Sequence, residues 1–240
     1  VPVALRAGPP KAFELRAKER MPIEHDTRVV AKIFRHAARL LSVSLPDVYV
    51  QPRRPGRLML ANCIEKGRLA PAVIVGRDLM TGYRDTEIAA SVGATLALLR
   101  PAYYLKLTLS TLDELEAALA ASAQLVGRKL GRPELEPLTS AFVPEMQKRL
   151  TRPIAEALQA TVQRLPDQFD LARWRNAVDA AAQRAGLLVC GELAAAARMV
   201  SSESTWLGGP RPIQRVQELI TYSVSPSYFA ARRHLNVTVG

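Results

Sequence analysis

The sequence has few of the residues from which metal and thiol sites are built. It holds only two cysteines, Cys63 and Cys190, and three histidines in 240 residues. No pair of histidines has the spacing of metal ligands, so no zinc site or other Cys/His cluster is predicted. Both cysteines lie in apolar surroundings, which favours buried free thiols, with a disulfide as the alternative.

Long apolar runs and known catalytic motifs are also missing. The longest weakly polar stretch, from Ile88 to Leu99, is about half as long as a bilayer-spanning helix, so no membrane span is expected. The chain contains neither a glycine-rich phosphate loop nor a G-x-S-x-G nucleophile elbow. It begins at Val1 without a secretory signal, and we expect a cytoplasmic fragment from the C-terminal part of a longer polypeptide.

Aromatic residues are scarce whereas basic residues are plentiful. Aromatics make up 5% of the chain and its net charge is +11. Nucleic-acid binding would favour a continuous basic stripe with aromatics for stacking, and no such stripe is visible. The densest basic group is Arg53, Arg54 and Arg57, which are candidate interaction residues. The charge predicts a solvated basic surface first, an acidic protein partner second and nucleic acid third.

An alanine- and leucine-rich composition and the spacing of apolar residues predict an α+β fold that is mainly α. Residues 1–25 are expected to be an extended lead-in, and 26–240 a single domain. Within this domain, 26–84 predict one helix and a small sheet of about three strands, whereas 85–240 predict helices. The expected strands are 48–50, 58–61 and 72–75. The expected helices are 26–41, 85–99, 111–126, 135–149, 152–164, 170–186, 188–200 and 212–222.

Residues 73–99 read VIVGRDLMTGYRDTEIAASVGATLALL. This segment resembles the approach to the active-site helix of HtpX-like and Oma-like zinc metallopeptidases. The family's H-E-x-x-H pentad falls on residues 94–98, with Ala94 and Leu98 at the two histidines and Thr95 at the glutamate. Ala94 and Leu98 carry no donor atom for zinc, and Thr95 cannot act as a general base near neutral pH.

Residues 179–189, DAAAQRAGLLV, resemble the helix that supplies the family's third zinc ligand. Asp179 falls on the ligand glutamate and Gln183 on the aspartate that supports it. The resemblance implies a zincin-like helical domain that has lost its zinc ligands and holds no metal or cofactor. Degenerate copies of this kind resemble the C-terminal regions of deltaproteobacterial tetratricopeptide-repeat proteins.

The function implied by this resemblance is that of a pseudo-metallopeptidase domain without catalysis. It would serve as a structural or protein-interaction module, with a protein partner or other domains of the same polypeptide. One alternative is a hydrolase with a relocated site around Asp179, and another is a basic domain that binds nucleic acid or an anionic surface. Trp206, in a glycine-flanked loop, is either an interaction residue or a buried loop anchor.

Overall fold

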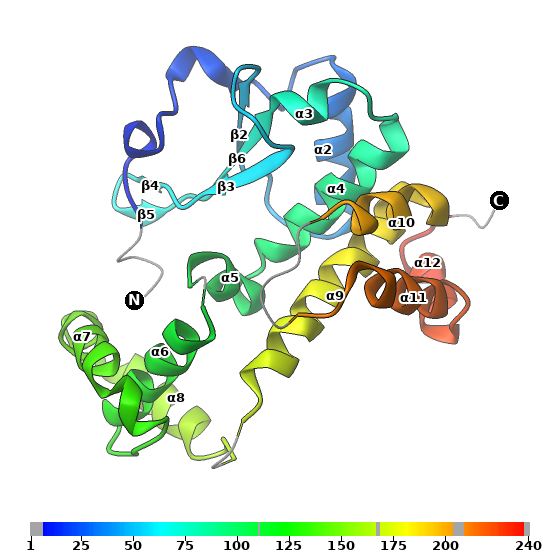
Figure 1. The fold of residues 1–240 in the computed structure, drawn as a ribbon. Coiled ribbons are helices and arrows are strands. Elements are labelled where there is room, and N and C mark those ends of the chain that lie inside the picture. Colours follow the sequence, from blue (N-terminus) through cyan, green and yellow to red (C-terminus); the bar gives the residue numbers. More distant parts are fainter. Residues whose placement is uncertain (1–6, 110, 167–168, 204–208, 238–240) are drawn as a thin grey trace. The chain divides into compact units, whose positions relative to one another are not determined.

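The computed structural model describes residues 7–109, 111–166, 169–203 and 209–237 (Figure 1). The predicted fold class is confirmed: the chain is mainly α-helical, with a small mixed sheet. By internal packing the chain divides into a larger unit, Gly8–Tyr103 with Asn176–Gly240, and a smaller unit, Tyr104–Arg175 with Val1–Ala7. The single domain over 26–240 stays a prediction, because packing alone does not say whether the units fold independently.

The sheet of the larger unit has four strands, in the order β1-β2-β6-β3. The parallel pair β2–β6 lies at its centre, and β1 and β3 are antiparallel to their neighbours. The strands are β1 (Arg20–Met21), β2 (Asp47–Gln51), β3 (Leu58–Ala61) and β6 (Ala72–Gly76). The expectation of three strands is corrected here, because the two-residue β1 adds a fourth at the edge. A separate ribbon is formed by β4 (Ile64–Glu65) and β5 (Arg68–Leu69).

Each face of the sheet carries its own apolar core. Val73 and Val75 of β6 pack with α2 (Val29–Leu40) and α4 (Asp85–Leu98), while Ile74 faces the other way. This alternation is the period-two pattern of a strand, and β6 is buried along its whole length. The face of Ile74 is covered by the N-terminal segment through Leu15, which is 6% exposed.

Residues 1–25 were expected to be extended, and this expectation is corrected for the described part of the segment. In its described part it forms the 3-10 helices η1 (Pro10–Phe13) and η2 (Ala17–Glu19) before β1. Short 3-10 turns of this kind have no long apolar repeat that a sequence pattern could show.

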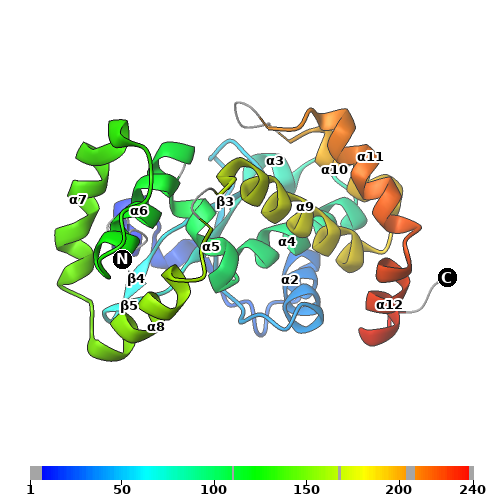
Figure 2. The ribbon, with the colours of Figure 1, turned by 90° about the horizontal axis from the view of Figure 1, so that it is seen from below.

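Four C-terminal helices complete the larger unit (Figures 1 and 2). They are α9 from Asn176 onward, α10, α11 and α12, and they share a core around Leu187 and Leu219. Glu87 of α4 joins this group, since its Oε1 accepts a hydrogen bond from Arg198 Nε of α10 at 2.6 Å. The full bounds are α9 (Leu171–Cys190), α10 (Leu193–Ser201), α11 (Pro212–Ser223) and α12 (Pro226–His234).

The smaller unit is helical around a core that includes Leu115 and Phe142. The predicted capping box at its first full helix is confirmed: Glu114 N donates to Thr111 Oγ1 at 3.1 Å, and Thr111 N donates to Glu114 Oε2 at 3.2 Å. Its helices are α6 (Leu112–Gln124), η3 (Pro133–Leu135), α7 (Glu136–Gln147) and α8 (Arg152–Val162).

Two short helices connect these elements: α3 (Arg77–Met80) after β6, and α5 (Pro101–Thr108) after α4. Among the described residues, no single helix is both long enough and apolar enough to cross a membrane. Helices α4 and α5 reach that length and apolarity only as a pair, and the pair is bent by 97°.

Candidate functional site

The three residues that the resemblance aligns with the H-E-x-x-H motif lie in the second half of α4. Ala94, Thr95 and Leu98 are all half-buried, and Ala94 and Leu98 pack against the main core. Ala94 also lies beside α9, because a Cβ built on Gly186 would be 3.5 Å from its Cβ. The two helices that resemble the zinc-binding pair are therefore in direct contact at this point.

Two glycines set how closely these helices approach. A Cβ on Gly186 of α9 would lie 2.6 Å from the backbone oxygen of Ala90 in α4. A Cβ on Gly93 of α4 would lie 2.8 Å from Val189 Cγ2 and 3.0 Å from Gly186 Cα. All three distances are too short for an unstrained Cβ contact, so the close crossing favours glycine at both positions.

Gln183, which the resemblance aligns with the supporting aspartate, contacts Arg215 of α11. In the amide orientation that satisfies both of its ends, its Oε1 accepts from Arg215 Nη2 at 2.6 Å and from Arg215 Nε at 2.8 Å. Arg215 of α11 also forms an ion pair with Glu203. Gln183 and Arg215 are each 7% exposed, so this contact joins α9 to α11 inside the unit.

Asp179, which the resemblance aligns with the third zinc ligand, is half-buried on α9 and interacts with other residues. In the described ranges, no group of three or more His, Cys, Asp or Glu side chains is placed to hold a metal ion. Four surface cavities in the described chain have linings that include none of Ala94, Thr95, Leu98, Asp179 or Gln183. Of these residues, Ala94 lies at the packed crossing of α4 and α9, whereas Gln183 contacts α11.

The two cysteines are free thiols, as predicted. Cys63 is buried beneath the sheet, and Cys190 is half-buried at the end of α9. Burial raises the pKa of the Cys63 thiol to about 11, with the charges of Glu65 and Asp47 adding to the effect. Burial likewise raises the pKa of Cys190, against an opposing hydrogen bond with the Glu192 backbone.

These raised pKa values predict slow thiol chemistry. At pH 8 Cys63 of the native protein should react with a disulfide reagent ~100-fold more slowly than in denaturant, because the thiolate is the reactive form. Cys190 should also react more slowly than in denaturant, since its pKa is raised as well. Absorbance after mixing measures the rate, and Cys63→Ser isolates the reaction of Cys190. A native thiol that reacts within the mixing time would contradict this expectation.

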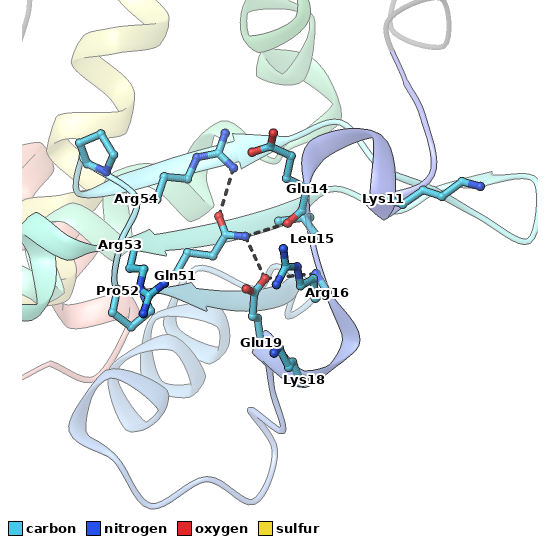
Figure 3. Close-up of a pocket in the computed structure, with 11 residues that line it drawn as sticks. Lys11, Glu14, Leu15, Arg16, Lys18, Glu19, Gln51, Pro52, Arg53 and Arg54 are labelled. Atoms are coloured by element: carbon cyan, nitrogen blue, oxygen red, sulfur yellow. Dashed lines mark hydrogen bonds between the residues drawn. The ribbon is translucent and has the colours of Figure 1, made fainter.

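The predicted basic group is divided by the structure. Arg53 and Arg54 lie in the loop after β2 and line an open basin of about 1020 Å³ (Figure 3). Arg57 does not line it: Nη1 of Arg57 donates to Ser202 Oγ at 2.9 Å, at the end of α10. Trp206 lies outside the described residues.

The opposite side of the basin comes from the N-terminal segment, which the sequence pattern did not single out. It contributes Lys11, Arg16 and Lys18, together with Glu14 and Glu19. These residues have no motif that marks them. They reach the Arg53 loop because β1 pairs with β2 and Leu15 packs on the sheet. A polar network then crosses the basin at Gln51.

Gln51, the last residue of β2, is the centre of that network. Its Nε2 donates to the Glu14 backbone oxygen at 3.0 Å and to Glu19 Oε2 at 2.9 Å, and its Oε1 accepts from Arg54 Nη1 at 3.1 Å (Figure 3). The hydrogen bond from Gln51 is the main reason that the pKa of Glu19 lies below its ordinary value; burial opposes it, and the Arg16 backbone supports it. Glu19 is thus held as a carboxylate.

The Arg53 loop is held from the sheet side as well. Gly56 N donates to Asp78 Oδ2 at 2.8 Å, and Arg77 N donates to the Arg54 oxygen at 2.8 Å. A Cβ on Gly76 would lie 2.4 Å from the Gly56 oxygen, so the loop lies directly on the end of β6. Hydrogen bonds therefore hold both sides of the basin, the N-terminal segment and the Arg53 loop, in place.

Comparisons with known proteins identify no relative: no protein-family model matches the chain, and no curated protein or solved structure matches it at a significant level.

Proposed function

We propose that this chain is a non-catalytic interaction module of a larger polypeptide, in which α4 and α9 serve packing rather than zinc chemistry. The observation that carries the proposal is the crossing at Gly93 and Gly186. A zinc site there would need two imidazoles from α4, one helical turn apart, and a carboxylate from a second helix. Ala94 and Leu98 instead contribute to the apolar core.

The contacts of α9 support the same proposal. Gln183 accepts hydrogen bonds from Arg215, and Gly186 allows α9 to approach the backbone of Ala90. Neither arrangement needs a metal ion. The relationship to metallopeptidases remains part of the proposal, and the partner would be another protein or another domain of the same polypeptide.

Metal content and peptidase activity test this proposal directly. Protein purified without chelators should contain less than about a tenth of an equivalent of zinc, because a structural or catalytic site would bind it stoichiometrically. Elemental analysis measures the zinc, and a labelled casein assay run beside an authentic zinc peptidase measures cleavage. Stoichiometric zinc, or cleavage that a chelator abolishes, would overturn the proposal.

A further inference from the structure

The basin at Gln51 carries a local excess of positive charge. Five of its lining side chains are cationic and two are carboxylates, which leaves three net positive charges. The side chains of Lys11 and Arg53 form no ion pair or hydrogen bond with any described residue. Their charges are therefore available to a ligand. The cations are Lys11, Arg16, Lys18, Arg53 and Arg54, and the carboxylates are Glu14 and Glu19.

The side chains of the basin differ in how firmly they are placed. Arg54 is fixed by Gln51 and by the Phe13 backbone oxygen, to which its Nη1 donates at 3.3 Å. Lys18 and Arg53 are exposed on the two sides, and Figure 3 shows Lys11 directed away from Gln51. A ligand would meet one preorganised guanidinium, which loses little order on binding, with exposed cations around it.

Size and chemistry narrow the class of ligand. A volume of 1020 Å³ is that of a site for a large ligand, rather than for a single small anion. The lining has no aromatic side chain on which a base could stack. Glu14 and Glu19 would repel phosphates and carboxylates alike, whereas Pro52 and Pro55 offer apolar surface to the uncharged side chains of a peptide. These features favour carboxylates spaced along a polypeptide over a nucleic acid.

We infer that this basin binds an acidic, extended polypeptide segment of a partner protein. The segment's carboxylates would pair with Arg53, Arg54 and Lys18, and its intervening apolar groups would contact the two prolines. This inference rests on the proposed function, since it names the chemistry of the partner that such a module would bind. Peptide binding tests the inference, whereas zinc content and peptidase activity test the proposed function.

Fluorescence anisotropy provides the test, with a labelled peptide of about ten residues in which glutamate alternates with alanine. The variant Lys18→Glu/Arg53→Glu reverses two exposed charges of the basin, neither of which forms a hydrogen bond from its side chain. We expect its Kd for the peptide to rise roughly tenfold or more at low salt. Binding by the unaltered protein should weaken between low salt and physiological salt.

The matched control is Lys32→Glu/Arg39→Glu, which makes the same charge change on the exposed side of α2. Circular dichroism should show that both variants keep their helices, and the control should bind the peptide nearly as well as the unaltered protein. Equal weakening by the two variants, or no peptide binding at all, would overturn the inference. So would tighter binding of an oligothymidylate of the same charge. None of these outcomes alters the zinc and peptidase results, so the two proposals fail separately.

Discussion

Replacing Gly186 by alanine should lower the free energy of unfolding by about 2–3 kcal/mol, as expected of overpacking at a site that cannot relax. The new Cβ would lie 2.6 Å from the backbone oxygen of Ala90, and α4 would have to move away from α9. Helix propensity alone predicts the opposite sign, since alanine is favoured over glycine by about 1 kcal/mol within a helix. Urea unfolding followed by circular dichroism measures the change, and its sign decides between the two effects.

Further variants separate the effect of the close helix crossing on stability from the effect of helix propensity. Ala177→Gly, on the exposed side of the same helix, should lower stability by only about 1 kcal/mol. Gly93→Ala should also destabilise, because its Cβ would lie 2.8 Å from Val189 Cγ2, 2.9 Å from Val189 Cβ and 3.0 Å from Gly186 Cα. Val189→Ala removes only the first of these contacts, so it should relieve only a small part of the loss. Val189→Ala should not rescue Gly186→Ala, which meets backbone. A Gly186→Ala variant more stable than the original protein would show that the helices do not cross this closely.

The same glycine shows what a sequence pattern can and cannot predict about a helix end. The sequence analysis expected one helix to end at Gly186 and the next to begin at residue 188. In the structure α9 continues to Cys190, and the glycine in the turn is Gly191, with φ of 66°. Gly186 is needed for the approach of Ala90, a contact that lies about a hundred residues away and leaves no local signal.

Elements with a strong apolar repeat were predicted well. The stripe through Phe34 predicted α2, and the buried run through Ile74 predicted β6. β1 was not predicted because two residues cannot show an alternating pattern; it exists through the pairing of Arg20 with Tyr49. Local periodicity therefore predicted the elements with their own buried face. It missed β1, which long-range pairing creates, and the two-residue strands β4 and β5.

The candidate site divides in the same way. The cluster of arginines was visible in the sequence, but their spacing did not show that Arg54 and Arg57 point to different parts of the unit. Arg54 donates to Gln51 and Phe13, whereas Arg57 donates to Ser202, 145 residues away. The cations of the N-terminal segment were unmarked because their role depends on the sheet. The composition of a basic loop is local, whereas the basin is made by tertiary structure.

Arg215 should be the most sensitive charged residue of the C-terminal helices. Replacing it with methionine would leave the buried Gln183 oxygen without its donor and Glu203 without its ion-pair partner. Breaking a buried pair in this way is expensive, although the Glu203 side chain is 33% exposed and can be partly solvated. We therefore expect Arg215→Met to lower the free energy of unfolding by about 2–3 kcal/mol.

Arg184 offers a matched control, because it also joins α9 to α11 but does so at the surface. It pairs with Glu218 at 2.6 Å and lies over the Tyr222 ring at 4.9 Å, with its side chain 44% exposed. Arg184→Met should therefore change stability by no more than about 1 kcal/mol. Gln183→Leu/Arg215→Met should recover part of the loss, since it removes both buried partners together. Equal effects of the two single arginine variants would show that burial of Arg215 adds nothing to the stability of this helix pair.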